Sequence, residues 1–350
     1  MEKKRFNCSP TMSFEVERIY KNYLYSKVRR LFREESIMKF TKILMLLLCP
    51  LCFGMFSANF QCTAAQTASH VRTYDGAMLH YKVFGKGAPV LLLSGGPGLN
   101  GDYLLPVATE LSKTHQAILL HQRGTDKSRN YVIDASTMTL KMAVSDIETL
   151  RAHLKLEKLI LIGHSWGGGL AMAYAAQHPA RIQALILVSS VGVNMGSLKD
   201  FGSNIRSRLT PTDLEAAAFW SEPAREKANP ERAGYEYMRA ILPGYVFERR
   251  NALLMIENLT PESFNPFVAE LMLMDLARNY NVQAAMSGFK QPVLIVQGRQ
   301  DPIGEPTANQ TKQTLAQAGL EFIEKCGHFP WVEQHEKFFS IIRDFLGNLK

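Results

Sequence analysis

Short runs of consecutive apolar residues recur along the chain from residue 90 onwards. They span Val90–Leu93, Ala117–Leu120, Leu159–Ile162, Ala184–Val188 and Val293–Val296. A strand that is apolar at every position is buried on both faces, whereas a half-exposed strand alternates apolar and polar residues. Helical stretches lie between several of these runs, at Thr139–Leu154 and Leu170–Gln177. Strands that alternate with helices predict an α/β fold, with a mostly parallel sheet flanked by helices.

A β-hairpin is expected to open this sheet. Val71–Tyr74 and Met78–Val83 are rich in strand-forming residues, and Asp75 and Gly76 between them are typical of a tight turn. The first two strands are therefore predicted to be antiparallel, in contrast to the strands that follow.

The alternation of strands and helices breaks between about residues 193 and 289. No strand-like run occurs there, and Phe, Tyr, Met and Leu recur at helical spacing, as in Phe264–Tyr280. An insertion of this length between two strands predicts a helical lid above the carboxyl ends of the sheet. We expect its aromatic and Met side chains to serve mainly in packing. The predicted parts of the chain are a leader (1–65), a first core part (66–192), the lid (193–289) and a second core part (290–350).

The positive charge of the chain is concentrated in the leader. The formal net charge is +8, and residues 1–65 hold 11 Lys and Arg against 5 Asp and Glu, which leaves +2 for the remainder. A nearly neutral body gives no reason to expect nucleic-acid binding. With 350 residues, 46% of them apolar, the chain has ample material for one large core.

The leader contains the pattern of a secretory signal peptide. Met38 is followed by two lysines and then by an apolar run from Ile43 to Phe56, which Pro50 and Gly54 interrupt. This layout is typical of a signal peptide and is short for a membrane span of about 20 residues. We predict a start at Met38 and an exported, periplasmic or secreted protein.

Two alternatives for the leader stay open. Cleavage is expected near Ala64 or Ala65, but an uncleaved leader would anchor the protein to a membrane, as would a lipid attached to Cys62. Cys326 is the one cysteine of the body, so no disulfide within the body is expected, and a buried packing role is predicted for it.

Gly163-His164-Ser165-Trp166-Gly167 carries the clearest chemical signal. It fits G-x-S-x-G, directly after the strand Leu159–Ile162 and directly before a helical stretch. This strand, turn and helix context is that of a nucleophile elbow, in which a tight turn lifts the serine hydroxyl above the sheet. Ser165 is therefore the predicted nucleophile.

A serine nucleophile needs a base and an acid that orients the base, in the chain order Ser, Asp or Glu, His. Asp301 follows the strand Val293–Val296, and His328 follows the β-like run Leu320–Glu324. Both positions lie in loops just past strand ends, where an open α/β sheet places its site. We predict Asp301 as the acid and His328 as the base.

Acyl transfer also needs hydrogen-bond donors for the oxyanion. One is usually the backbone N–H after the nucleophile, and another comes from the loop after the third strand, here Ser94–Gly98. We assign them to Trp166 and Gly96. No metal-ligand cluster is evident from the sequence, and Ser94–Gly98 lacks the Gly-Lys-Ser/Thr ending of a phosphate-binding loop. No cofactor is expected.

The body from about Val71 onwards resembles the α/β-hydrolase superfamily and, within it, the proline iminopeptidase group of serine peptidases. Ser94–Gly98 resembles the H-G-G-P-G of that group, Gln122-Arg123-Gly124 with Ser128 resembles its D-Q-R-G-x-G-x-S, and Gly163–Gly168 matches its G-x-S-W-G-G. Three positions depart from these patterns: Ser94 replaces His, His121 replaces Asp, and Asp126 replaces Gly. The segment Gly327–Trp331 is more similar to esterases and C–C hydrolases.

The resemblance implies an exported serine aminopeptidase that releases N-terminal proline or a small residue from short peptides. In that group acidic residues near the lid bind the free amine of the substrate, and Glu222 is the positional candidate here. Ser94, His121 and the apolar lid favour the alternative of a carboxylesterase or another small-molecule hydrolase. A non-catalytic ligand-binding protein on the same scaffold is a third hypothesis. The expected partner is a small-molecule or short-peptide substrate, with membrane contact only through the leader; the sequence does not indicate an oligomeric state.

Overall fold

The computed structural model describes residues 67–128, 132–257 and 259–349. The predicted leader, with its signal peptide and Cys62, lies outside the described residues. Within them, no helix combines the length and the apolar character that crossing a membrane requires.

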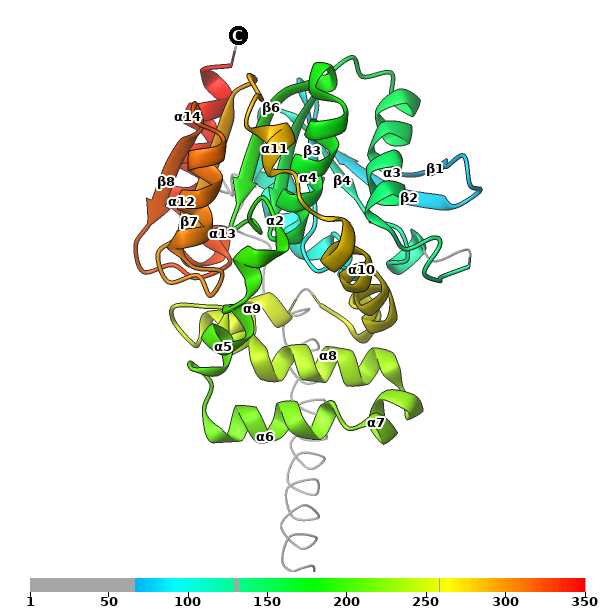
Figure 1. Cartoon of the computed structure of the whole chain (residues 1–350), viewed down its shortest axis with the longest axis vertical. Coiled ribbons are helices and arrows are strands. Elements are labelled where there is room, and N and C mark those ends of the chain that lie inside the picture. Colours follow the sequence, from blue (N-terminus) through cyan, green and yellow to red (C-terminus); the bar gives the residue numbers. More distant parts are fainter. Residues whose placement is uncertain (1–66, 129–131, 258, 350) are drawn as a thin grey trace, which may run out of the picture. The chain divides into compact units, whose positions relative to one another are not determined.

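One eight-stranded sheet forms the centre of the body (Figure 1). Its strands in spatial order are β1 (Thr67–Arg72), β2 (Met78–Phe84), β4 (Gln116–Leu120), β3 (Pro89–Leu93), β5 (Leu159–His164), β6 (Ile182–Val188), β7 (Val293–Gly298) and β8 (Gly319–Ile323). β2 is antiparallel to both β1 and β4, and the pairs from β4 to β8 are parallel. The predicted mostly parallel sheet with an antiparallel opening hairpin is confirmed.

The hairpin begins earlier than its apolar pattern indicates. β1 starts at Thr67 rather than Val71, and its first four residues are exposed. An edge strand with polar, solvent-facing side chains forms its ladder through backbone hydrogen bonds alone, so it leaves no apolar run in the sequence.

Alternate residues of the buried strands face two separate apolar layers. Leu91 and Leu93 of β3 pack in one cluster with α3 (Leu140–His153) and α4 (Trp166–Gln177). Val90 and Leu92 pack in the other with α2 (Leu105–Leu111) and α14 (His335–Gly347). Helices on both faces explain why these strands are apolar at every position.

The helix after the nucleophile motif starts four residues before its predicted first residue, Leu170. α4 begins at Trp166, and its first turn contains three consecutive glycines. A Cβ on Gly167 would collide with the Leu93 carbonyl, and one on Gly168 would collide with Ser190. The glycines therefore permit close packing of a helix against the sheet, whereas a pattern-based interpretation assigns them to the turn.

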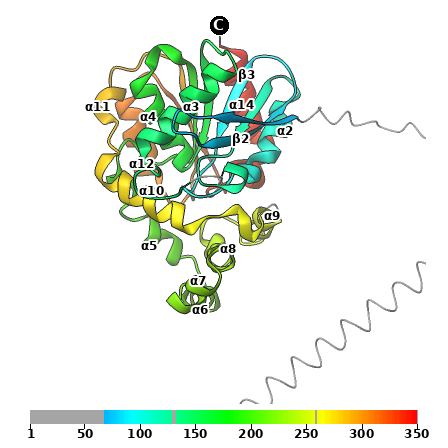
Figure 2. The same ribbon diagram turned by 90° about the vertical axis from the view of Figure 1, so that its right-hand side faces the viewer.

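Among the described residues between β6 and β7, the chain forms helices and no strand. They are α5 (Phe201–Arg206), α6 (Pro211–Trp220), α7 (Pro223–Ala228), α8 (Pro230–Ile241), α9 (Asn251–Ile256), α10 (Pro266–Asn279) and α11 (Gln283–Met286), with short 3₁₀ turns. In Figures 1 and 2, α8 lies between the core and the pair α6 and α7. The loops at the carboxyl ends of the strands thus lie between the sheet and this helical layer.

Candidate active site

Ser165 occupies the sharp turn between β5 and α4. Its backbone angles are φ 55° and ψ −121°, in a region that residues with a side chain rarely adopt. Such a conformation costs about 1–3 kcal/mol and persists only where the surroundings impose it. Here the Ser165 N–H donates to the carbonyl of Val188, and a Cβ at Gly163 would collide with Gly167. The strained turn is that of a nucleophile elbow.

Asp301 and His328 meet at the ends of neighbouring strands. β7 pairs with β8, and the loops after these two strands carry the two side chains. Nδ1 of His328 lies 3.0 Å from each carboxylate oxygen of Asp301, and both residues are buried. Asp301 also accepts a hydrogen bond of 2.8 Å from the N–H of Ile303, which fixes its carboxylate. Because the N–H at Nδ1 of His328 is hydrogen-bonded to the Asp301 carboxylate, Nε2 is the ring nitrogen that can accept a proton.

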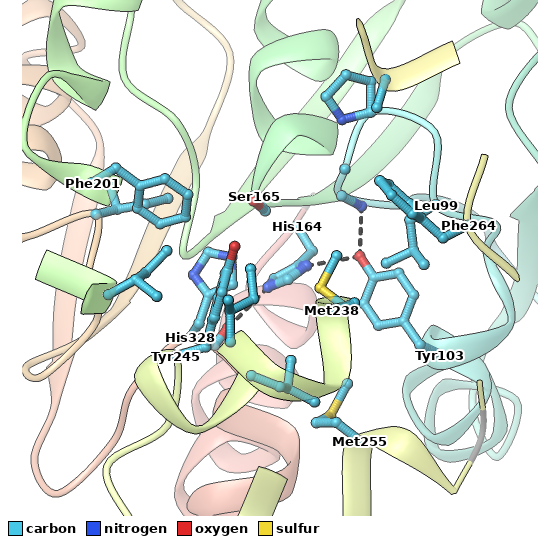
Figure 3. Close-up of a pocket in the computed structure, with 18 of the residues that line it drawn as sticks. Leu99, Tyr103, His164, Ser165, Phe201, Met238, Tyr245, Met255, Phe264 and His328 are labelled. Atoms are coloured by element: carbon cyan, nitrogen blue, oxygen red, sulfur yellow. Dashed lines mark hydrogen bonds between the residues drawn. The ribbon is translucent and has the colours of Figure 1, made fainter. Parts of the chain in front are cut away.

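Ser165 and His328 line the same cavity, which has a volume of about 380 Å³ (Figure 3). The cavity extends into the lid, where Phe201 and Tyr245 lie beside the ring of His328, with ring centroids 6.2 and 5.4 Å away. Most lining side chains are apolar, and no Asp, Glu, Lys or Arg is among the described residues that line it. The site thus combines a polar reactive end with an apolar chamber.

The two residues predicted to bind the oxyanion flank Ser165. Gly96 lines the cavity with φ +109°, and Trp166 is the first residue of α4. A Cβ on Gly96 would meet the backbone nitrogens of Leu99 and Gly98 at 2.9 and 3.0 Å, so the loop needs glycine there. The N–H groups at the start of a helix have no acceptor within it and can bind an anion.

Gln122 joins these two segments, a role that the sequence does not reveal. Its Nε2 donates to the carbonyl of Ser94 at 2.7 Å, and its Oε1 accepts from the indole of Trp166 at 3.1 Å. Gln122 thereby holds the loop that contains Gly96 against the start of α4.

Tyr103 and His164 form a second buried link between the two sides of the site. The Tyr103 hydroxyl accepts from the Gly95 N–H and lies 2.8 Å from Nδ1 of His164, while Nε2 of His164 lies 2.9 Å from the backbone carbonyl of His328. A carbonyl only accepts, so Nε2 carries the proton and Nδ1 accepts from Tyr103. Burial, with the nearby His328, lowers the pKa of His164 well below its usual value, which keeps the ring neutral.

Glu333 supports the loop of His328 from the other side. It lies in α13 (Pro330–Glu333), and its two carboxylate oxygens accept from the N–H groups of Gly327 at 2.9 Å and Phe247 at 2.7 Å. Burial raises the pKa of this carboxyl group despite these donors. The His328 N–H in turn donates to the carbonyl of Tyr245 at 2.8 Å, so a backbone hydrogen bond connects His328 to the helical layer.

Two other sequence predictions have different outcomes. Cys326 is buried, and burial raises the pKa of its thiol, so its predicted packing role is confirmed. Glu222, the candidate for binding a substrate amine, precedes α7 and is half exposed, with its carboxylate 3.1 Å from the Arg225 guanidinium. It is not among the described residues that line the cavity.

Comparison with known proteins identifies the family. Residues 88–334 match the alpha/beta hydrolase fold family. A proline iminopeptidase from Lactobacillus helveticus is 28% identical over 289 residues, which cover 78% of this chain and 95% of that protein. A 2-hydroxymuconate semialdehyde hydrolase from Pseudomonas sp. is 29% identical over 278 residues, or 75% and 88% of the two chains.

Solved structures show the same fold. An esterase from Exiguobacterium antarcticum superposes with a TM-score of 0.62 at 18% identity, covering 80% of this chain and 99% of that one. A meta-cleavage product hydrolase from Pseudomonas fluorescens superposes with a TM-score of 0.60 at 20% identity, covering 81% and 98%. With its family match, its sheet and its helical flanks, the chain belongs to the α/β-hydrolase family.

Proposed function

We propose that this protein is a serine hydrolase that cleaves esters of uncharged, apolar acyl groups, with Ser165 as nucleophile, His328 as base and Asp301 as the acid that orients it. The observation that carries the proposal is the apolar chamber that opens onto Ser165 and His328, without a charged side chain among its described lining residues. A cavity of about 380 Å³ is within the usual range of small-molecule sites.

The proposed reaction uses the three residues in the roles of a serine triad. Oγ of Ser165 attacks the carbonyl carbon while Nε2 of His328 takes the hydroxyl proton, and the Asp301 carboxylate stabilises the imidazolium that forms. The carbonyl oxygen becomes an oxyanion, which the N–H groups of Gly96 and Trp166 stabilise. The C–O bond to the leaving alcohol then breaks, and the alcohol takes the proton from His328.

Hydrolysis of the acyl-enzyme repeats these steps with water. His328 takes a proton from the water as its oxygen attacks the acyl carbon, and the proton then passes to Oγ of Ser165 as the ester bond to the serine breaks. The carboxylic acid leaves, and the enzyme returns to its starting state.

The absence of charge in the described lining favours a neutral substrate. An ammonium group moved from water into an apolar chamber without a partner loses several kcal/mol of solvation free energy. A peptide with a free N-terminus would place such a group close to the scissile bond. A neutral acyl chain gains free energy on burial, about 25 cal/mol per Å² of apolar surface.

An aminopeptidase remains the second candidate, because several similar curated proteins are proline iminopeptidases at 24–28% identity. This activity requires a group that binds the substrate amine, and Glu222 does not line the cavity. Tyr103, Tyr237 and Tyr245 offer hydroxyl groups there, but burial raises the pKa of Tyr103 and Tyr245, so those two stay uncharged.

One set of assays distinguishes the candidates. Purified wild type and Ser165→Ala are incubated with p-nitrophenyl esters of increasing acyl length and with proline, alanine and leucine arylamides. We expect ester turnover that rises with acyl length until the cavity is filled and that is lost in Ser165→Ala. Ser190→Ala is the matched control, because Ser190 is buried nearby, binds the carbonyl of Val191 and does not line the cavity.

Two results would contradict the proposal. Arylamide turnover without ester turnover would establish the aminopeptidase instead. No turnover, together with no labelling of wild type by a fluorophosphonate probe, would favour a non-catalytic ligand-binding protein.

A further inference from the structure

Three histidines lie side by side on neighbouring strands, away from the cavity. His70 of β1 pairs with His80 of β2, and the N–H of His121, just after β4, donates to the carbonyl of His80. Residues that pair across strands share one face of the sheet. The rings of His70 and His80 are 4.8 Å apart between centroids, and those of His80 and His121 are 4.9 Å apart.

The ring of His80 is buried without a hydrogen-bond partner among the described residues. Its side chain is 1% exposed, and neither ring nitrogen has a hydrogen-bond partner among the described residues. A buried polar group without a partner costs about 1–3 kcal/mol, and nearly all such groups in native proteins are satisfied. A ligand between His80 and its neighbours would satisfy it.

The neighbours of His80 provide two further donor atoms. Nδ1 of His121 lies 3.0 Å from Oδ2 of Asp126, and one candidate ligand atom each from His80, His121 and Asp126 lies within 4.8 Å of the other two. Asp126 begins η2 (Asp126–Ser128), and its carboxylate is partly exposed. An ion could therefore enter from solvent on the Asp126 side.

Asp102 contacts His121 on the side of the ring that faces away from Asp126. Its Oδ1 lies 3.1 Å from Nε2 of His121 and 2.6 Å from the ammonium group of Lys82. A carboxylate that accepts the outer N–H of an imidazole fixes the tautomer in which the other nitrogen binds a metal, an arrangement that is usual for histidine ligands. With Nε2 bound to Asp102, Nδ1 of His121 faces Asp126 and the interior of the cluster.

We propose that His80, His121 and Asp126 bind a divalent zinc ion. Two imidazole nitrogens and one carboxylate oxygen suit Zn²⁺, whereas Mg²⁺ and Ca²⁺ prefer oxygen donors throughout. Bonds of about 2.0–2.1 Å in a tetrahedron place ligand atoms about 3.4 Å apart. The candidate ligand atoms here lie up to 4.8 Å apart, so side-chain rotation would bring them to this distance when the ion binds. Water or the exposed His70 can supply the fourth ligand.

Two of the three proposed ligands, His121 and Asp126, are positions at which the chain departs from the resembled motif. The related group has Asp where this chain has His121, and Gly where it has Asp126. The sequence shows no metal-ligand spacing because His80 is 41 positions before His121, and antiparallel pairing of β2 with β4 brings them together. Both changed positions thus supply a donor to one cluster.

The role that follows for zinc is structural. The ion would join β2, the end of β4 and η2, and His121 directly precedes Gln122, which braces the loop of Gly96.

Metal content and stability test the proposal without an activity assay. The purified full-length protein is stripped with a chelator, titrated with Zn²⁺ in competition with a chromophoric chelator, and separately loaded with Co²⁺ for visible absorption. We expect one Zn²⁺ per chain, a tetrahedral Co²⁺ spectrum, and a Tm that rises with the Zn²⁺ concentration.

Asp126→Gly is the decisive variant. Asp126 has φ +42°, a conformation that glycine adopts without strain, so the change removes a ligand while favouring the native backbone. Lys155→Gly is the matched control, since Lys155 is exposed and has φ +55° outside the cluster. We expect Zn²⁺ affinity to fall at least about tenfold in Asp126→Gly and in His80→Ala, and to be unchanged in Lys155→Gly.

A rival occupant of the cluster is a proton. The ring of His121 lies between two carboxylates, with Nε2 3.1 Å from Asp102 and Nδ1 3.0 Å from Asp126, so an imidazolium there would need no metal. In that case the wild type would bind no Zn²⁺ against the chelator. This result, or equal Zn²⁺ affinity in wild type, His80→Ala and Asp126→Gly, would overturn the proposal.

Discussion

The hydroxyl of Tyr103 lies 2.8 Å from Nδ1 of His164, and the opposite side of the same hydroxyl accepts the N–H of Gly95. His164 continues the link to the backbone carbonyl of His328. The loop proposed to bind the oxyanion and the loop of the proposed base are thus connected through two buried side chains, neither of which breaks a bond in the proposed mechanism.

Tyr103→Phe should lower kcat with little change in KM. The substitution keeps the ring but leaves the N–H of Gly95 and Nδ1 of His164 without partners, which costs about 1–3 kcal/mol for each buried group. The loop can then relax from the geometry that stabilises the transition state, whereas the apolar side chains of the chamber, including the ring at position 103, are kept. Steady-state kinetics and urea unfolding measure the two effects.

Tyr174→Phe separates the catalytic effect from a general loss of stability. The Tyr174 hydroxyl donates to Glu148 on α3, and Tyr174 does not line the cavity. We expect reduced stability with a kcat near that of wild type. Equal kcat losses in the two variants would show that the link through Tyr103 has no specific role.

Asp301→Asn should abolish most activity without unfolding the protein. An amide in place of the carboxylate can donate to Nδ1 of His328, which favours the tautomer with the proton on Nε2, where the base must be free. A loss of about 10⁴-fold in kcat is typical of this change in a serine triad. Ester hydrolysis measured beside circular dichroism checks both parts, and activity within tenfold of wild type would refute the assignment of the acid.

The buried His164 should make stability depend on pH below neutrality. Since the pKa of His164 is depressed in the folded state, the unfolded chain binds a proton at this residue below about pH 6.5 while the folded chain does not. Stability is therefore greatest above pH 6.5 and falls as the pH decreases towards the folded pKa. One such group changes the free energy of unfolding by up to about 1.4 kcal/mol per pH unit.

His164→Gln tests this contribution. The amide can accept from Tyr103 and donate to the His328 carbonyl, but it does not titrate. Urea unfolding at a series of pH values from 7 to 5 should give a shallower slope for His164→Gln than for wild type. Parallel slopes would show that other groups cause the loss of stability in acid.

Asp146→Asn should be among the most destabilising single substitutions away from the site. Asp146 accepts two hydrogen bonds from Arg123, and both side chains are almost completely buried. Removal of one partner from a buried ion pair costs about 3–5 kcal/mol, and the Arg123 guanidinium would keep the more distant carboxylate of Asp75, 3.3 Å away, as a counterion. Glu236→Gln breaks the exposed pair with Arg239 and should cost at most about 1 kcal/mol. Chemical unfolding gives both values, and similar losses would contradict this account.

The order of buried strands and the G-x-S-x-G turn could be predicted because their causes are local. Apolar runs give strands buried on both faces, and a glycine-flanked serine after such a run gives the turn at Ser165. Asp301 and His328 could be placed from their positions after strands. The starts of the edge strand β1 and of α4 were missed, since backbone pairing and close packing leave no apolar pattern.

The supporting residues could not be predicted from the sequence. Tyr103 precedes His164 by 61 positions, and Glu333 contacts Phe247 across 86 positions. Each is an ordinary residue locally, and only the packing of helices on the sheet gives it a partner. Glu222 is the opposite case. Its position in the sequence predicted a place in the substrate site, but it directly precedes α7, and no described residue of α7 lines the cavity.

The order in which the site residues occur along the chain also governs when activity can arise during synthesis. Ser165 precedes the lid, while Asp301 and His328 follow it, on loops after the last two strands of the sheet. A nascent chain that ends before residue 301 carries the serine hydroxyl without the proposed acid and base. The growing polypeptide therefore cannot form an acyl-enzyme at an appreciable rate, and hydrolysis begins only after the ribosome has released the C-terminal strands to complete the sheet.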